Sequence, residues 1–221
     1  MSAEYILSRA ARLREEMRAS GASAYVALND EDSNWESLFY LSGFRGTAGA
    51  IVIYDNAEPE FILDGRYAEA GRAQSPYKVT EQEESLAEDV RASLRAHGAE
   101  EILCEARKTS HENWLRLADG LGRWRDGGAV MEKLRRKKDA EEISCIKKAA
   151  EIGARAFLEA LDAVRPGMTE KEFESLLNYR ISAAGGGAGF DMIVPSGARG
   201  AMPHGRATAK PMERGECVTV D

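Results

Sequence analysis

The chain opens with the apolar spacing of a helix and then changes to the period of β-strands. Ile6, Ala10, Leu13 and Met17 recur at helical intervals, which predicts a helix with one buried face, and Gly21 is placed to end it. The runs AYVAL, AIVIYD and EFILD that follow are short and rich in β-branched and aromatic residues, so each is predicted to be a strand. A polar turn separates the last two, which favours a hairpin.

Helices and strands continue to alternate up to residue 130. Ser85 and Glu88 have the spacing of a capping box, EILCE is typical of a strand, and Ser110 is placed to cap a further helix. Because helices alternate with short apolar strands, we predict that residues 1–130 form an α/β domain with helices packed on a central sheet. The Gly-rich and charged stretch GLGRWRDGG marks its expected end.

A second domain is expected over residues 131–221. Asp139 with Glu142, and Thr169 with Glu172, have capping spacings that predict the starts of two helices. The predicted buried stripe of the first of these helices comprises Ile143, Ile146, Ala150, Gly153, Phe157, Ala160 and Val164. The segments DMIVPS and ECVTVD then predict two short strands.

Composition and charge exclude several classes of protein. The 221 residues include 30 basic and 37 acidic side chains, and the net charge of -7 would repel a phosphate backbone, so we expect no nucleic-acid partner. The N-terminus lacks the continuous apolar stretch of a signal peptide or membrane span, so we expect no membrane association. The cysteines Cys104, Cys145 and Cys217 are far apart and odd in number, which favours reduced thiols and a cytoplasmic protein.

Two residues near the end of the sequence are candidates for chemistry. Asp221 ends a predicted strand, where an acidic side chain faces water, caps a turn or meets a cation, because burial of a lone carboxylate is costly. His204 lies between Pro203 and Gly205, where a rigid and a permissive residue could hold an imidazole at the edge of a cleft. On residue type alone, both positions are more often structural than functional.

Several segments resemble a known family. MEKLRRKKDAEEISCIKKAAEIGARAF, VRPGMTEKEFESLL and GFDMIVPSGARGAMPHGRATAKPMERGECVTVD are similar to the opening of the catalytic domain of Xaa-Pro aminopeptidases and prolidases. FYLSGFRGTAGAIVIYD and ILDGRYAEAGRAQ resemble the non-catalytic domain that precedes it in the same proteins. This resemblance implies a creatinase/prolidase-like N-terminal α/β domain followed by the first half of a pita-bread catalytic domain.

The resemblance also implies a metallo-aminopeptidase, either an Xaa-Pro aminopeptidase or an Xaa-Pro dipeptidase. Such enzymes hold a pair of divalent metal ions through Asp, His and Glu side chains, with manganese expected here and cobalt or zinc as alternatives. Asp221 matches the first metal-ligating aspartate of the family, and His204 matches the histidine that lies beside the metals and hydrogen-bonds the substrate. Carboxylate-bound cations of this kind activate a bridging water and polarise the scissile carbonyl.

The implied partners are peptides with proline in the second position and a second copy of the chain in a homodimer. No residue follows Asp221 in this sequence, so the remaining metal ligands of the family are absent from it, and we expect an inactive N-terminal piece of a longer peptidase. Two alternatives stay open: a creatinase-like C–N hydrolase, which uses no metal in its family, and a non-catalytic oligomerisation or binding module. Ligand-type Asp, His and Glu residues after Asp221 would distinguish an enzyme from a module.

Overall fold

The structure is a computed structural model that describes residues 2–221 and divides into two compact units, Met1–Glu141 and Glu142–Asp221. The division falls later in the chain than the boundary expected after residue 130. The physical reason is that helix α6 (Gly128–Arg136) packs Met131 and Leu134 into the core of the first unit. The stretch GLGRWRDGG, expected to end the domain, instead contains strand β6 (Arg123–Asp126).

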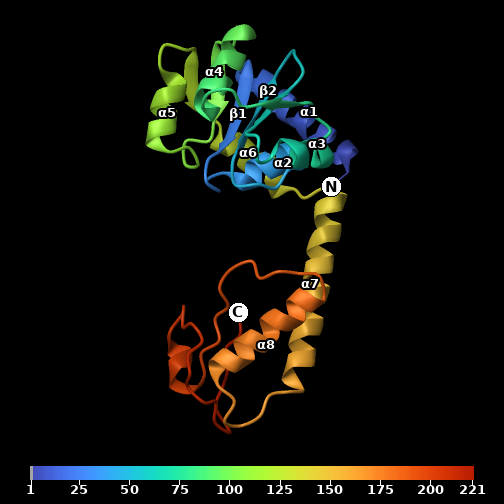
Figure 1. The fold of residues 1–221 in the computed structure, drawn as a ribbon, viewed down its shortest axis with the longest axis vertical. Coiled ribbons are helices and arrows are strands. Elements are labelled where there is room, and N and C mark those ends of the chain that lie inside the picture. Colours follow the sequence, from blue (N-terminus) through green and yellow to red (C-terminus); the bar gives the residue numbers. More distant parts are fainter. Residues whose placement is uncertain (1) are drawn as a thin grey trace. The chain divides into compact units, whose positions relative to one another are not determined.

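A six-stranded sheet in the order β4-β3-β2-β1-β5-β6 forms the centre of the first unit (Figure 1). Its strands are β1 (Ala24–Asn29), β2 (Gly49–Tyr54), β3 (Glu60–Leu63), β4 (Val79–Glu81), β5 (Glu101–Cys104) and β6. Strand β2 pairs antiparallel with β1 and β3, and the other pairs are parallel. The predicted hairpin of β2 and β3 is therefore confirmed, and the sheet agrees with the predicted α/β class.

Both faces of this sheet are buried, because successive side chains of a strand point to opposite faces. Tyr25 and Ala27 of β1 lie in one apolar core, whereas Val26 and Leu28 lie in the other. The first core is completed by residues of α1 (Ala3–Ser20), α2 (Trp35–Ser42), α3 (Ala68–Gln74) and α6, and the second by residues of α4 (Leu86–Ala96) and α5 (His111–Ala118). Helices thus cover the two faces, as the alternation of elements predicted.

The helix ends of the first unit confirm the predicted capping residues. Gly21 adopts a left-handed conformation with φ of +70° and ends α1 through hydrogen bonds from the backbone N–H groups that follow the helix. At the start of α4, Ser85 Oγ accepts a hydrogen bond from the Glu88 N–H at 3.3 Å. At the start of α5, Ser110 Oγ accepts one from the Asn113 N–H at 3.1 Å.

The second unit contains two helices, α7 (Ala140–Leu161) and α8 (Glu170–Ala183), and a short 3-10 helix, η1 (Gly197–Ala201). Its small core joins Ala160 of α7 to Phe173 and Leu177 of α8 and to Val194 and Met212 of the segments that follow. The predicted capping box of α8 is confirmed, since Thr169 Oγ1 accepts from the Glu172 N–H and Glu172 accepts from the Thr169 N–H.

Two expectations for the second unit are wrong. Of the predicted stripe along α7 only Ala160 is buried, and Ile143 and Ile146 are 44% and 55% exposed, because the packing of α8 covers only part of that helix. The segments DMIVPS and ECVTVD form isolated bridges, such as Ser196 with Val218, in place of continuous strands. Pro195 of the first segment has no backbone N–H to donate, so the ladder of backbone hydrogen bonds between the two segments is incomplete.

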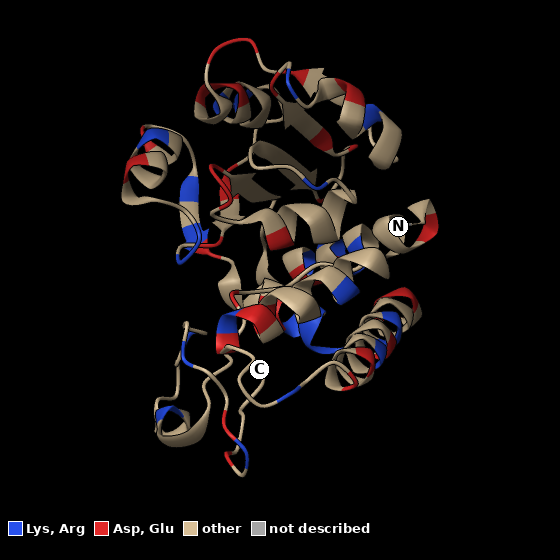
Figure 2. Ribbon diagram, turned by 60° about the horizontal axis from the view of Figure 1, so that its bottom comes forward, with Lys and Arg blue, Asp and Glu red and all other residues tan. Residues whose placement is uncertain are grey.

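The surface carries both signs of charge on each unit, and acidic and basic residues are interspersed along the helices (Figure 2). Lys133, in the basic run at the end of α6, donates to both carboxylate oxygens of Glu16 at 2.6 and 2.7 Å. All three cysteines are free thiols; Cys104 is buried, and Cys145 and Cys217 are exposed. Among the described residues, no helix is both long and apolar enough to cross a membrane.

Candidate functional site

Asp221 lies at one end of a short antiparallel ladder in the second unit. Its backbone N–H donates to the Ile193 carbonyl at 3.0 Å, and its carbonyl accepts from the Ile193 N–H at 3.0 Å. Thr219 donates to the Pro195 carbonyl at 3.0 Å, which continues the ladder. The two reciprocal bonds place Asp221 directly opposite Ile193. The Asp221 carboxylate is exposed and has no hydrogen-bond or ion-pair partner among residues 2–221.

His204 lies on the other side of the same segment. Ile193 also forms an antiparallel bridge with Arg206, two residues after His204. The turn that contains His204 is closed by a hydrogen bond of 3.1 Å from the Gly205 N–H to the Met202 carbonyl. The imidazole is exposed and has no partner within the described part of the chain. Residues 193–197 are therefore flanked by the segment that carries Asp221 and by the segment that carries His204.

A buried carboxylate, that of Glu170, holds the loop that contains His204. Glu170 Oε1 accepts from the Ser196 N–H at 2.7 Å and from Ser196 Oγ at 2.9 Å. Glu170 Oε2 accepts from the Thr208 N–H at 3.0 Å and from Thr208 Oγ1 at 2.8 Å. Arg199 Nε lies 3.3 and 3.2 Å from the two oxygens. The Glu170 side chain has no exposed surface, so these donors satisfy it completely.

The same contacts determine the protonation of Glu170. Burial acts to raise its pKa, but the hydrogen bonds from Thr208 and Ser196 outweigh burial and lower the pKa to about 2. Glu170 is thus a carboxylate at neutral pH. Sequence reasoning missed it, because an acidic residue in the first turn of a helix is common on the exposed side, where it meets the positive end of the helix dipole.

Lys210 connects Ser196, which donates to Glu170, with Glu216 at the start of the segment that carries Asp221. Its Nζ donates to Ser196 Oγ at 3.0 Å and to the two oxygens of Glu216 at 2.9 and 2.7 Å. The hydrogen bond from Lys210 holds the pKa of the Glu216 carboxyl below its usual range. Gly197 has a φ of +55°, a left-handed conformation that glycine adopts without strain, and a Cβ there would meet the Glu216 carboxylate.

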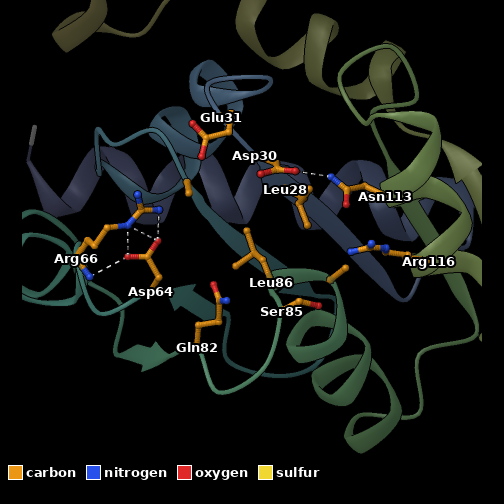
Figure 3. A pocket seen from close by; sticks show the side chains of 12 residues that line it. Leu28, Asp30, Glu31, Asp64, Arg66, Gln82, Ser85, Leu86, Asn113 and Arg116 are labelled. Atoms are coloured by element: carbon orange, nitrogen blue, oxygen red, sulfur yellow. Dashed lines mark hydrogen bonds and ion pairs between the residues drawn. The ribbon is translucent and has the colours of Figure 1, made fainter.

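The first unit has a cavity of about 250 Å³ at the edge where β1 and β3 end (Figure 3). Ligands often bind at the carboxyl ends of strands in open α/β sheets. Here, however, Asp30 accepts from Asn113 Nδ2 at 2.9 Å, and Asp64 forms an ion pair of 2.7 Å with Arg66. The hydrogen bond from Arg66 lowers the pKa of Asp64. These four polar side chains of the lining thus pair with one another.

The described residues do not make up a complete metal site. Among residues 2–221, no group of three or more His, Cys, Asp or Glu side chains could hold a metal ion. Asp221 offers one exposed carboxylate, and carboxylate oxygen is a suitable ligand for hard divalent cations. A metal ion bound at Asp221 would therefore need further ligands from outside residues 2–221.

Two family models match the chain in succession. The Creatinase/Prolidase N-terminal domain matches residues 9–137, and Metallopeptidase family M24 matches residues 144–221. The uncharacterized peptidase YqhT of Bacillus subtilis (strain 168) is 31% identical over 82% of this chain and 52% of its own length. The chain spans about half the length of the curated relatives it matches.

Solved structures of proline-specific peptidases have the same fold as this chain. The X-Pro aminopeptidase from Thermotoga maritima MSB8 superposes with a TM-score of 0.87 at 33% identity, over 96% of this chain and 60% of that chain. The Xaa-Pro dipeptidase from Bacillus anthracis superposes with a TM-score of 0.86 at 29% identity, over 98% of this chain and 60% of that chain. The expected fold, a creatinase/prolidase-like α/β domain followed by the N-terminal part of a pita-bread domain, is therefore confirmed.

Proposed function

The chain belongs to the Creatinase/Prolidase N-terminal domain family, and residues 144–221 match Metallopeptidase family M24. On this premise we propose that the full-length protein is a metal-dependent peptidase that hydrolyses the bond before proline. The observation that carries this proposal is that the peptidase match over residues 144–221 includes both His204 and Asp221. The similarity to an X-Pro aminopeptidase and to an Xaa-Pro dipeptidase supports the same substrate class. Release of an N-terminal residue and cleavage of a dipeptide are the two forms of this activity.

Asp221 is proposed to ligate a divalent metal ion, and His204 to hydrogen-bond the substrate. Both side chains are exposed and without partners among the described residues, so they are free for these roles. Membership of a metallopeptidase family implies divalent metal ions. We propose manganese, because carboxylate and water ligands suit it, with cobalt and zinc as alternatives. The imidazole of His204 would donate a hydrogen bond to the substrate carbonyl as negative charge develops there.

A bond before proline is a tertiary amide with no N–H, so a peptidase that cleaves it needs a pocket shaped for the ring. Peptides with proline in the second position are the proposed substrates, and a homodimer is the proposed assembly. Three free thiols with no close Cys spacing support a reducing compartment such as the cytoplasm.

The test is a substrate panel on the full-length protein, freed of metal and then loaded with manganese, cobalt or zinc. The panel contains an Xaa-Pro dipeptide, an Xaa-Pro-Yaa tripeptide, a tripeptide without proline, and creatine. We expect metal-dependent cleavage of one of the proline peptides only. Metal-independent hydrolysis of creatine, or metal-dependent cleavage without preference for proline, would contradict the proposal.

Two substitutions test the assigned residues. Asp221→Asn keeps the size of the side chain but removes its charge, so bound metal and kcat/KM should both fall, the latter by about a hundredfold or more. His204→Ala should lower kcat by about a hundredfold with metal content unchanged. Cys217→Ser, an exposed position on the same ladder, is the matched control and should behave as wild type. Full activity of both Asp221→Asn and His204→Ala would reject the assignment.

A further inference from the structure

We infer that Glu170 is a positioning residue for His204: its buried carboxylate holds the two arms of the loop, residues 196–208, that presents the imidazole. The inference rests on the role proposed for His204. The Glu170 side chain has no exposed surface, so it is not placed to contact a substrate. It acts through the backbone of the loop.

The first arm of the loop is held at Glu170 Oε1. Ser196 donates both its backbone N–H, at 2.7 Å, and its hydroxyl, at 2.9 Å, to this one oxygen. Ser196 is itself buried, and it lies directly before η1. A residue held by both its backbone and its side chain has little freedom to rotate, so the start of the loop is fixed in position and in orientation.

The second arm is held at Glu170 Oε2 in the same manner. Thr208 donates its N–H at 3.0 Å and its hydroxyl at 2.8 Å. Arg199 connects the arms, since its Nε contacts Glu170 and its Nη2 donates to the Arg206 carbonyl at 2.7 Å. The Glu170 carboxylate therefore holds both ends of the loop together, and the Arg199 guanidinium links Glu170 to the second arm at Arg206.

The position of the His204 imidazole depends on how Glu170 holds the loop, because His204 has no side-chain partner of its own among residues 2–221. The neighbouring Gly205 is buried, and a Cβ there would lie 3.0 Å from Pro195 Cβ, so the tip of the loop rests against Pro195. An exposed side chain without partners is positioned only by its backbone. Small displacements of a catalytic group reduce rates strongly, by up to about a hundredfold for 1 Å.

The chemistry of the contacts requires a carboxylate at position 170. Every group that faces the two oxygens is a donor: the Ser196 and Thr208 N–H groups, their hydroxyls, and Arg199. An ionised carboxylate has only acceptors and matches this set, whereas a glutamine would turn its NH₂ group toward one arm. Glu170→Gln should therefore release one arm and leave the other held.

The first experiment measures hydrogen exchange in the full-length protein and requires no activity. Glu170→Gln should raise amide exchange across residues 196–208 by about tenfold or more, with exchange in α1 and the sheet of the first unit unchanged. The matched control is Glu172→Gln, which makes the same charge change in the same helical turn but hydrogen-bonds only to Thr169. It should leave exchange over residues 196–208 as in wild type.

The second experiment asks whether Glu170 acts through His204. Against a proline peptide, Glu170→Gln should lower kcat/KM by about tenfold to a hundredfold, but it should cause no further loss in a His204→Ala background. Thr208→Val, which removes the hydroxyl that donates to Glu170 and accepts from the Lys210 N–H at 3.3 Å, is the milder variant if Glu170→Gln fails to fold. It should lower kcat/KM in the same direction, again only when His204 is present.

The outcomes separate this inference from the proposed function. Unchanged exchange over residues 196–208 in Glu170→Gln, or equal losses with and without His204, would overturn the positioning role. Raised exchange together with an inactive wild-type protein would instead reject the proposed peptidase activity while Glu170 still holds the loop. Raised exchange with a loss of activity that requires His204 supports both.

Discussion

The guanidinium of Arg9 forms a buried ion pair with the carboxylate of Asp139. Arg9 Nε donates to Asp139 Oδ2 at 2.8 Å, and Nη2 lies 2.7 Å from the same oxygen. The Arg9 side chain is 1% exposed, and its guanidinium also lies over the Tyr40 ring, 4.7 Å from the ring centroid. Arg9 lies in α1, and Asp139 directly precedes α7, 130 residues later in the chain. The ion pair therefore attaches the C-terminal end of the first unit to its first helix.

Removal of Asp139 should destabilise the first unit. Asp139→Ala removes a carboxylate that pairs with the buried Arg9 guanidinium, which should cost about 3 kcal/mol of the free energy of unfolding. Urea denaturation followed by tryptophan fluorescence measures this, because all three tryptophans, Trp35, Trp114 and Trp124, lie in the first unit. Asp32→Asn is the control, since Asp32 pairs with Arg45 at a site where both side chains are about half exposed. A loss below about 1 kcal/mol for Asp139→Ala would show that the pair contributes little.

The stability of the second unit should depend on pH through Glu170. The folded-state pKa is lowered from 4.5 to about 2, so the stabilisation is complete above about 4.5 and is lost as the pH falls toward 2. The difference between wild type and Glu170→Gln in the opening free energy of α8, measured by amide exchange, should therefore shrink between pH 4.5 and pH 2. A difference that stays constant over this range would contradict the assignment.

The capping box of α8 should contribute measurably to that helix. Thr169→Ala removes the hydroxyl that accepts from the Glu172 N–H at 3.1 Å, which should cost about 1 kcal/mol. Amide exchange in the first turn of α8 should rise about fivefold. Thr169→Ser retains the hydroxyl and should exchange nearly as slowly as wild type. Equal exchange in the alanine and serine variants would show that the cap is not the source of the stability.

Two neighbouring glycines should differ in their tolerance of alanine. Gly120 and Gly122 have φ angles of +61° and +55°, so alanine is strained at both. A Cβ at Gly122 would also lie 2.8 Å from the Glu100 carbonyl oxygen, whereas a Cβ at Gly120 meets nothing within 4 Å. Gly122→Ala should therefore be more destabilising than Gly120→Ala by about 1–3 kcal/mol in urea denaturation. Equal losses would mean that the backbone near Glu100 can shift freely.

Elements with strong local signals were predicted correctly. The helix that ends at Gly21, the capped starts of α4 and α5, and the hairpin of β2 and β3 all depend on residues within a few positions of one another. Edge strands were not predicted. β4 and β6 are the two edges of the sheet, they are short and largely polar, and their pairing with β3 and β5 defines them.

The candidate site was predicted only in part. His204 and Asp221 were selected by family resemblance, and their roles remain predictions. The structure adds that the segments carrying them flank residues 193–197. Glu170 gave no signal in the sequence, because its partners Ser196 and Thr208 lie 26 and 38 residues away.

By itself the sequence determined the helices and strands with clear periods and caps, the order of the two domains, and the identity of the two candidate residues. The helices and strands follow from short-range hydrogen bonding and from the alternation of apolar side chains, whereas the domain order and the candidate residues follow from the family resemblance. Only the tertiary structure decided the edges of the sheet, the part of α7 that is covered, and the burial of Glu170. Each of these depends on which distant segments meet, since a buried carboxylate is stable only where donors from elsewhere in the chain surround it.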